Sequence, residues 1–444
     1  MKKKLAIVGS GIAGLGILHK LSHHYEITLF ETNNYLGGHT NTLSVEDGSN
    51  QISIDSGFMV FNETTYPHLT ELFRTLDVAT VDTDMSFSVQ DSTSDVEWSG
   101  TGIKRFFARQ SNFWKPGFYR MLFNISKFND AGLRDVGTEA IERITVREYL
   151  EKNEISLSAR KEYILPMMSS LWSANESDML DFPIQHLLRF MQTHGLLSTY
   201  GQLQWKTVVG GASQYVGKLK ESASAHYKLQ ARVVEVRNTP GPNVSQRAAA
   251  NGTPIVVKTE DGHSHYFDKC VVATHADQAA KLLDRSVQQN DELFGLLSNF
   301  RYQENQVSLH TDSSVMPQSK GNWASWNYLL SHAQQSGSVH YWMNSLQPLR
   351  TKTNYFISLN SESFIAHSKI KKQLVYEHPV FSVACLDAQK QLRAYNQNSA
   401  NLFFCGSYFD FGFHEDALLS SYQVAEILNR EEHLASPAIA VSER

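Results

Sequence analysis

The apolar positions near the N-terminus form two short runs with a helix-like stretch between them. Leu5–Val8 is an unbroken apolar run, which is typical of a strand that is buried on both faces. Apolar residues then recur at helical spacing from Ile12 to Leu21, and Glu26–Phe30 predicts a second strand. The order strand, helix, strand predicts a βαβ unit of a parallel sheet.

The segment that joins the first strand to the helix has the spacing GxGxxG. In a βαβ unit the first glycine permits a tight turn, the second lets the backbone approach a pyrophosphate, and the third lets helix and strand pack closely. The helix N-terminus offers free N–H groups to the anion, and Glu31 is placed to accept hydrogen bonds from an adenosine ribose. The pattern predicts a dinucleotide site without distinguishing NAD from FAD. Its loop residues are Gly9, Ser10, Gly11, Ile12, Ala13 and Gly14.

Farther along the chain the pattern changes twice. Residues 100–200 are rich in Phe, Leu, Met and Arg at helical spacing and predict helices, with an unusually aromatic stretch over residues 106–128. Most of that stretch is expected to be core, the alternative being an aromatic surface that faces lipid or an apolar tunnel. Residues 300–360 contain strand-like runs, among them Gln306–His310 and Tyr355–Leu359, and predict a mixed sheet that forms the floor of a substrate pocket.

The residues after Glu31 discriminate among dinucleotide sites. Here the chain resembles the superfamily of flavin-containing amine oxidases and phytoene desaturases, whose FAD signature is GxGxxG, an acid and a glycine pair. The resemblance implies that the segment after the glycine pair lies along the FAD, and that an Asp-x-Gly motif, here beginning at Asp55, brings backbone close to the isoalloxazine. Many members of the superfamily carry arginine where this chain has His39. The residues implied are Gly37, Gly38, His39, Thr40, Gly57, Phe58 and Met59.

Later segments fit the same superfamily. Ala231–Val236 resembles the strand that such flavoproteins lay beside the adenine, and Lys269–Thr274 resembles the strand and turn that return to the nucleotide fold. Asn401–Ser407 and the helix-like His414–Ser421 resemble a terminal FAD motif, which would point the positive end of a helix at the flavin N1/O2 edge. The alternative is that the acids at the start of this helix only complement its own dipole. The implied FAD contacts are Val233, Thr274, Gly406, Ser407, His414 and Glu415.

Sequence strings outside these motifs narrow the resemblance. Gly57–Asn62, Leu309–Asp312, Trp323–Tyr328 and Glu377–Phe381 are similar to a bacterial subfamily of predicted NAD/FAD-binding oxidoreductases. The likeness covers nearly the whole chain. Members of this subfamily are found beside cyclopropane fatty-acid synthases, which implies an acyl-chain substrate.

These features predict an α/β fold with two domains and a tail. The first is a Rossmann-like FAD-binding domain assembled from discontinuous segments, and the second is a mixed α+β substrate domain. The predicted segments are 1–80, 205–290 and 395–430 for the FAD-binding domain, 81–204 and 291–394 for the substrate domain, and 431–444 for a flexible tail.

Composition restricts the class of protein. The 444 residues are 41% hydrophobic and 19% charged, with a formal net charge of −5, which is ordinary for a globular protein and argues against a nucleic-acid partner. No apolar run approaches the roughly 18 residues of a transmembrane helix, so we expect a cytoplasmic protein that is soluble or at most peripheral to a membrane. Cys270, Cys385 and Cys405 are too scattered for a disulfide framework, and the histidines show no HExxH spacing, so no metal is expected.

The sequence offers candidates for catalysis without fixing a catalytic residue. By family position, His414 and Trp172 are expected near the flavin. His310 and Asp312 lie two apart on a predicted strand and would face the same side, either as an acid–base pair or, the favoured interpretation, as a structural ion pair. Amine oxidases of the superfamily commonly place a lysine near flavin N5, but residues 285–319 contain no lysine.

Three functions remain open. The favoured one is an FAD-dependent oxidoreductase of the dehydrogenase or desaturase type, which removes hydride from a carbon of an apolar, fatty-acyl substrate while the flavin carries the chemistry. The second is an amine oxidase-type flavoenzyme that acts on an amine or a polycyclic substrate. The third is a flavin-bound accessory protein that supports a partner enzyme without turnover of its own. FAD is expected to be noncovalent, because no cysteine occupies the family position for a thioether bond.

Overall fold

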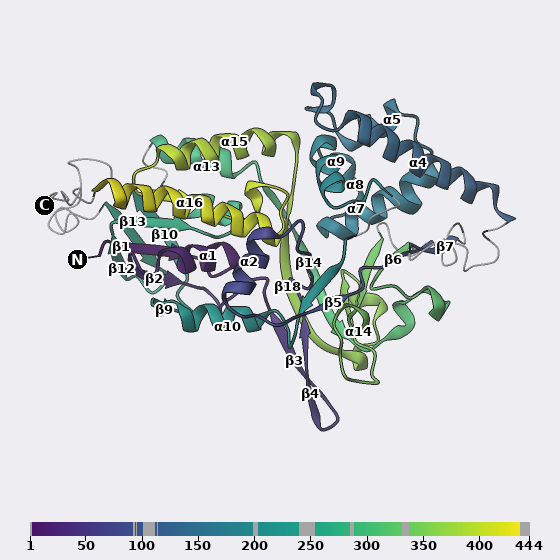
Figure 1. The fold of residues 1–444 in the computed structure, drawn as a ribbon, viewed down its shortest axis with the longest axis horizontal. Helices are drawn as coiled ribbons and strands as arrows, with labels where there is room; N and C mark the ends of the chain where they lie inside the picture. Colours follow the sequence, from purple (N-terminus) through teal and green to yellow (C-terminus); the bar gives the residue numbers. More distant parts are fainter. Residues whose placement is uncertain are drawn as a thin grey trace, which may run out of the picture. The chain divides into compact units, whose positions relative to one another are not determined.

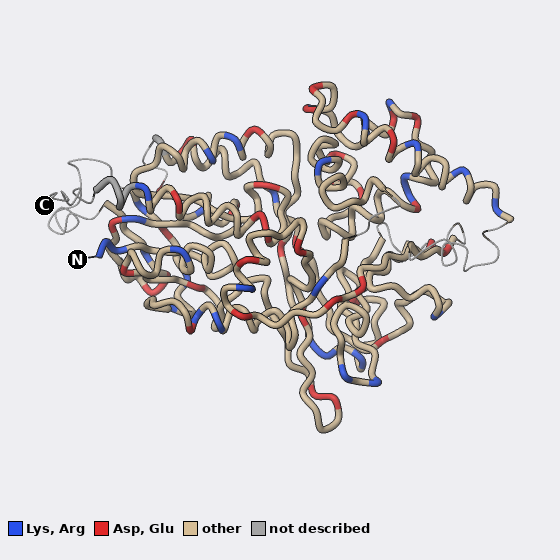
Figure 2. The backbone as a smooth tube through the Cα atoms, in the orientation of Figure 1, with Lys and Arg blue, Asp and Glu red and all other residues tan. Residues whose placement is uncertain are grey.

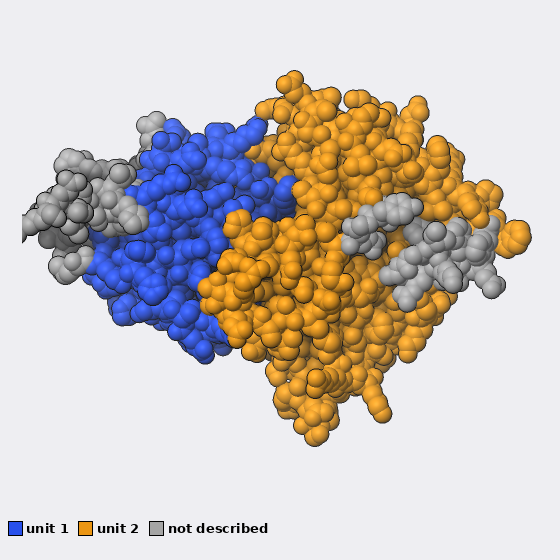
Figure 3. Space-filling model, in the orientation of Figure 1, with its two compact units in different colours: residues 1–38, 215–299, 387–444 blue, residues 39–214, 300–386 orange. Residues whose placement is uncertain are grey.

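The chain divides into two compact units (Figure 3). Unit 1 comprises Met1–Gly38, Tyr215–Asn299 and Asp387–Arg444, and unit 2 comprises His39–Gln214 and Phe300–Leu386. Each unit therefore combines segments that lie far apart in the sequence. The computed structural model describes residues 2–91, 94, 96–100, 112, 114–198, 203–238, 254–284, 288–330 and 337–435.

The unit boundaries differ from the boundaries drawn from the sequence. Residues 39–80 lie in unit 2, although the sequence analysis groups them with the FAD-binding segments. Residues 205–214, which the sequence analysis also groups with the FAD-binding segments, lie in unit 2 as well. Backbone pairing joins the two stretches, since Phe61 forms a bridge with Lys206, and β5 (Thr80–Thr83) pairs with β8 (Trp205–Val208). The prediction that residues 39–80 contact FAD stays a prediction.

Unit 1 is built on a five-stranded parallel sheet with the order β19-β13-β1-β2-β9 (Figure 1). The predicted βαβ unit is confirmed, since β1 and β2 pair in parallel and α1 (Ile12–Leu21) connects them. The apolar run of β1 is buried, as a strand covered on both faces requires. The strands are β1 (Lys4–Val8), β2 (Glu26–Phe30), β9 (His226–Lys228), β13 (Lys269–Val272) and β19 (Leu402–Phe404).

Helices and a small antiparallel sheet complete unit 1. α1 packs beside α16 (His414–Ala435), and the missing side chain of Gly16 permits this approach, because a Cβ there would collide with Ser421. Residues 431–435 are the last residues of α16, and residues 436–444 lie outside the described residues, so the tail predicted over 431–444 stays a prediction. The other elements are β10 (Val233–Asn238), β11 (Ile255–Thr259), β12 (Ser264–Phe267), α12 (Ala276–Leu282) and α13 (Gln288–Leu297). α10 (Ser213–Ser222) and α15 (Val383–Asn398) begin in unit 2 and continue into unit 1.

Unit 2 contains a seven-stranded mixed sheet with the order β18-β14-β17-β16-β15-β6-β7. Its pairs are antiparallel except for β15 with β6, which confirms the predicted mixed sheet. The strands are β6 (Phe87–Asp91), β7 (Val96–Ser99), β14 (Arg301–His310), β15 (Trp326–Leu330), β16 (Ser338–Trp342), β17 (Phe356–Leu359) and β18 (Ile370–Val380). A separate hairpin is formed by β3 (Thr42–Asp47) and β4 (Asn50–Asp55).

The predicted helices between residues 100 and 200 are confirmed where the structure describes the chain. α5 begins with a capping box between Thr145 and Glu148, which satisfies backbone donors at the helix N-terminus. The helices of unit 2 are α2 (Pro67–Thr75), α4 (Pro116–Asp135), α5 (Val146–Lys152), α6 (Leu157–Ala159), α7 (Leu165–Trp172), α8 (Glu176–Leu180), α9 (Ile184–Thr193) and α14 (Met343–Leu346).

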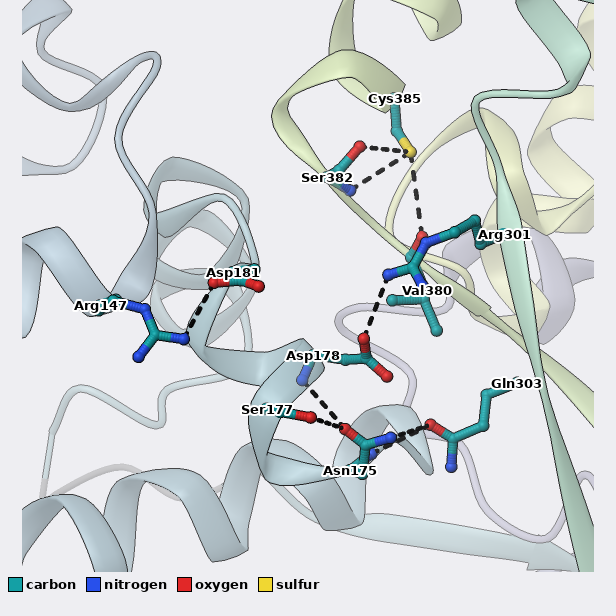
Figure 4. A network of polar contacts seen from close by, with 10 residues as sticks. All are labelled: Arg147, Asn175, Ser177, Asp178, Asp181, Arg301, Gln303, Val380, Ser382 and Cys385. Carbon is teal, nitrogen blue, oxygen red and sulfur yellow. Dashed lines mark hydrogen bonds and ion pairs between the residues drawn. The ribbon is translucent and has the colours of Figure 1, made fainter.

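Polar contacts fasten α8 to strand β14 of the sheet (Figure 4). The side chain of Asn175 caps α8 by accepting the N–H of Asp178 at 3.0 Å. The Nδ2 of Asn175 also donates to Gln303 at 3.2 Å, and Arg301 forms an ion pair with Asp178 at 3.1 Å. One capping residue thus joins the helical part of unit 2 to its sheet.

The aromatic stretch is divided between core and surface. Phe118 and Phe128 of α4 are buried, as expected, whereas Tyr119 and Phe123 are 47% and 70% exposed. Residues 101–111 and 113 lie outside the described residues. The inner face of α4 is therefore core, and its outer face is an aromatic surface.

Candidate functional site

The glycine loop of unit 1 has two positions fixed by packing and one that is open. Gly9 has φ +100°, and a Cβ there would lie 2.7 Å from the carbonyl oxygen of Ala273. A Cβ at Gly14 would collide with the Gly9 carbonyl, whereas a Cβ at Gly11 would meet nothing within 4 Å. Open space in front of the second glycine is what the approach of a pyrophosphate requires.

Ser10 connects this loop to the acid that follows β2. The buried Glu31 carboxylate accepts the N–H of Ser10 at 3.0 Å and its hydroxyl at 2.5 Å. The other carboxylate oxygen accepts the N–H and the Nδ2 of Asn33 at 2.8 and 2.9 Å. These four donors hold Glu31 beside the loop, where the sequence analysis places a ribose ligand.

The glycine pair lies against the same loop. Gly37 has φ +119° and donates its N–H to the carbonyl oxygen of Ser10 at 3.0 Å. Gly38 has φ +58°, and a Cβ there would come within 3.2 Å of the Gly11 Cα. Both positions therefore favour glycine, and the structure brings the pair close to the glycine loop.

Segments distant in the sequence reach this loop in unit 1. A Cβ at Gly9 would lie 3.2 Å from the Thr274 side chain, and a Cβ at Gly406 would lie 3.4 Å from the Thr274 carbonyl oxygen. Gly406 precedes Ser407 and donates its N–H to a side chain of α16. Val233 begins β10 just after Ala231, whose N–H donates to the Glu31 carbonyl oxygen at 2.9 Å. The structure thus brings Thr274 beside the glycine loop, Gly406 beside Thr274, and the segment before β10 beside Glu31.

The start of α16 carries a buried imidazole and a capping carboxyl group. His414 Nε2 lies 2.8 Å from the Tyr215 hydroxyl, and burial lowers the pKa of His414 to about 3, so its ring is neutral. Asp416 accepts the N–H of Phe413 at 2.8 Å, which caps the helix, while burial raises the pKa of Asp416. Asp416 therefore caps the start of α16 through a hydrogen bond. Glu415, also buried, precedes it.

In unit 2, the Asp-x-Gly motif is organised by Asp55. Its buried carboxylate accepts the N–H of Ala212 at 2.9 Å, the hydroxyl of Thr42 at 2.6 Å and the amide of Gln347 at 2.7 Å. Burial raises the pKa of Asp55 to about 7, and these donors oppose that shift. Gln347 could not be predicted as a partner, because it is nearly three hundred residues away from Asp55 in the chain.

The predicted residues 39–40 and 57–59 meet in unit 2. Phe58 donates its N–H to the His39 carbonyl oxygen at 2.9 Å, and a Cβ at Gly57 would collide with that carbonyl. The His39 ring lies 4.9 Å from the ring of Tyr376 and 5.5 Å from that of His378. Both rings come from β18, which the sequence analysis did not connect with this motif.

Comparison with known proteins agrees with this geometry. Residues 7–76 match the NAD(P)-binding Rossmann-like domain family. The sequence matches none of the curated proteins with which it was compared.

Solved structures share the fold over nearly the whole chain. Cyclohexylamine oxidase from Brevibacterium oxydans IH-35A has a TM-score of 0.67 at 14% identity, covering 97% of this chain and 100% of that one. A CLA-producing fatty acid isomerase from P. acnes has a TM-score of 0.66 at 12% identity, with coverages of 96% and 98%. A putrescine oxidase variant from a redesign of cofactor binding has a TM-score of 0.66 at 13% identity, with coverages of 97% and 99%. The fold expected from the amine oxidase resemblance is thus confirmed.

Two of the catalytic candidates lie inside the core of unit 2. Trp172 is 4% exposed and packs between the rings of Phe182 and Phe190, at 4.8 and 4.9 Å. His310 is fully buried in the seven-stranded sheet. Both have packing roles that are complete within the chain.

The expected pair of His310 and Asp312 side chains is not formed. The Asp312 carboxylate instead accepts the ammonium of Lys369 and the N–H of Ala366, each at 3.0 Å. Burial by itself would raise the pKa of Asp312, but these donors and the N–H of Ser314 hold that pKa below its usual range. Both the acid–base pair and the favoured ion pair with His310 are wrong, because loop residues after β17 provide better partners for the carboxylate.

His310 belongs to a one-way chain of hydrogen bonds across the sheet. The N–H of Asp312 donates to His310 Nδ1 at 3.1 Å, and burial lowers the pKa of His310 to about 4, so the neutral ring carries its proton on Nε2. Nε2 then donates to the Ser358 hydroxyl at 2.7 Å, and Ser358 donates to His340 Nδ1 at 2.7 Å. His340 Nε2 donates in turn to Ser338 at 2.9 Å. This order fixes one tautomer for both imidazoles.

Among the residues that the structure describes, no helix is long and apolar enough to cross a membrane. Within the same residues, His, Cys, Asp and Glu side chains form no group of three or more that could hold a metal ion.

Proposed function

We propose that the chain is an FAD-dependent oxidoreductase that removes hydride from a carbon of an apolar, fatty-acyl substrate. The observation that carries this proposal is the cradle of unit 1, where Gly11 leaves the backbone open and Glu31 is held beside it. Thr274 lies beside Gly9 of this loop, and Gly406 lies beside Thr274.

The residues present fit an FAD group. The loop Gly9–Gly14 would hold the pyrophosphate through its backbone N–H groups. Glu31 would accept ribose hydroxyls, since two of its four present donors are the rotatable side chains of Ser10 and Asn33 and can be replaced. When bound, the flavin would supply the hydride acceptor. The start of α16 at His414 would present a helix N-terminus to the reduced ring.

Two observations support an acyl substrate over an amine. One of the structures with this fold is titled as a fatty acid isomerase, which acts on an acyl chain. Residues 285–319 lack the lysine that amine oxidases of the resembled superfamily place near the flavin. The fold also occurs in cyclohexylamine oxidase and putrescine oxidase, so amine oxidation is the second candidate.

Anaerobic mixing of the FAD-loaded protein with two substrate panels tests the function. Unsaturated or methyl-branched fatty acyl lipids should bleach the flavin absorbance, since a dry, apolar site favours hydride loss from an acyl carbon. A panel of amines should not bleach it, because residues 285–319 contain no lysine. The readout is the absorbance of oxidised flavin after rapid mixing. Bleaching by amines alone would transfer the assignment to the second candidate, and no bleaching by either panel would favour an accessory protein.

The cofactor is expected to be noncovalent. Cys270 in β13 and Cys405 directly after β19 are both buried, and burial raises the pKa of both thiols, which disfavours the reactive thiolate. Acid precipitation of the purified protein should therefore release the yellow colour into the supernatant. Colour that stays with the pellet would show a covalent bond, and peptide mapping would then identify the attached residue.

A further inference from the structure

The outer face of α4 exposes aromatic side chains that take no part in the packing of its inner face. Tyr119 and Phe123 are 47% and 70% exposed and lie four residues apart, which places them on one side of the helix. Phe118, Met121 and Phe128 fill the opposite side and are buried. The core of unit 2 is therefore packed without the two exposed rings.

Two further large side chains are exposed on the segments that adjoin α4. Trp114, two residues before the helix, is 86% exposed, and Leu157 of α6 is 70% exposed. α6 packs against α4, and the N–H of Ser156 donates to the Asn124 side chain at 2.9 Å. We call Trp114, Tyr119, Phe123 and Leu157 the α4 aromatic face. Single exposed apolar residues are ordinary, but a group of four on adjacent helices indicates an interaction surface.

Positive charges predominate along the first part of α4, and the exposed Asp130 follows Lys127 by three residues on the same side of the helix. Residues 114–127 contain three basic residues and no acidic one, and Figure 2 shows Lys and Arg along α4. Arg120 is exposed between the two rings in the sequence, and Lys115 and Lys127 are half-buried. Lys127 lies 3.8 Å from Glu154, and Lys115 interacts electrostatically with Glu162. The first part of α4 thus combines exposed rings with more basic than acidic side chains.

We propose that the α4 aromatic face docks on the surface of an anionic phospholipid membrane. A helix that presents Trp, Tyr and Phe together with Lys and Arg is typical of helices that lie in the membrane interface, with rings at the headgroup level and cations beside anionic lipids. Since α4 does not meet the requirements for a spanning helix, it would lie along the surface. The proposal goes beyond the proposed function, and its test does not use turnover.

Sedimentation of the full-length protein with lipid vesicles tests this proposal. The protein should bind vesicles made of equal parts phosphatidylglycerol and phosphatidylcholine, and should bind pure phosphatidylcholine more weakly. Phe123→Ser should lower the partition coefficient about tenfold, from the apolar area of one ring. Arg120→Gln should lower it about fivefold on the anionic vesicles only, and high salt should reduce that difference.

The matched control is Phe364→Ser, which removes a ring that is 40% exposed elsewhere in unit 2 and should leave binding unchanged. Because Phe123 and Tyr119 are exposed, neither variant should unfold the protein, and Tyr119→Ser serves as a second test of the same face. Equal binding by the wild type and both ring variants would overturn the proposal. Failure to bind anionic vesicles would also overturn it, and a soluble protein captured through Phe123 without vesicle binding would assign the face to a protein partner.

Discussion

Gly11→Val should abolish FAD retention while leaving the fold intact. Gly11 has φ −61° and ψ 176°, an extended conformation that valine adopts readily, and a Cβ there would meet nothing within 4 Å. The substitution therefore does not strain unit 1. Its side chain would instead occupy the space that the pyrophosphate needs, so we expect affinity for FAD to fall by more than about a hundredfold.

The measurement is flavin absorbance per chain after purification, with the affinity obtained by titration of the apoprotein with FAD. Gly295→Val is the matched control, because a Cβ at Gly295 in α13 also meets nothing within 4 Å but lies far from the loop in the chain. The control should keep full FAD occupancy. Full occupancy in Gly11→Val, with an unchanged circular dichroism spectrum, would show that the nucleotide site is elsewhere.

The nucleotide cradle could be predicted because its determinants are local. Leu5–Val8 is apolar enough to be a buried strand, and the glycines of 9–14 follow it directly, so a window of about thirty residues specifies strand, turn, helix and acid. The structure has these elements at the predicted places. The bridging hydroxyl of Ser10 was missed, because at this position of the motif any small residue satisfies the spacing.

The polar contacts of unit 2 could not be predicted, because they join residues far apart in the chain. Asp55 meets Gln347, and His39 lies beside Tyr376, only after the strands of unit 2 have assembled. The expected partnership of His310 with Asp312 failed for the same reason. Alternation along a strand predicts the side of the sheet on which a residue lies. It does not predict which hydrogen-bond donors from distant segments lie beside its carboxylate.

Ser358→Ala should destabilise the protein by about 2–5 kcal/mol, because it removes the hydroxyl that joins two buried imidazoles. Ser358, His310 and His340 are at most 1% exposed, so water cannot replace the lost group. The variant leaves the Nε2 proton of His310 without an acceptor and His340 Nδ1 without a donor. Each such buried group costs about 1–3 kcal/mol.

The free energy of unfolding in urea, for wild type and variant, measures this effect, and Ser308→Ala provides the matched control. Ser308 is 1% exposed and pairs with Ser358 across β14 and β17, but it lies outside the hydrogen-bond chain, so its variant should lose much less. Equal losses in the two variants would mean that the hydroxyl of Ser358 only fills space.

Acid should lower the free energy of unfolding, because the fold keeps the two buried imidazoles neutral. Burial lowers the pKa of His310 to about 4 and that of His340 to about 3, below the ordinary value of 6.5 that each regains on unfolding. The unfolded chain therefore binds more protons than the folded one below pH 6.5. As the pH falls from 6.5 toward 4, each histidine lowers the free energy of unfolding by about 1.4 kcal/mol per pH unit. A double replacement of His310 and His340 by glutamine should reduce the dependence of the free energy of unfolding on pH below 6.5. If wild type and variant show the same dependence on pH, the imidazoles are not held neutral.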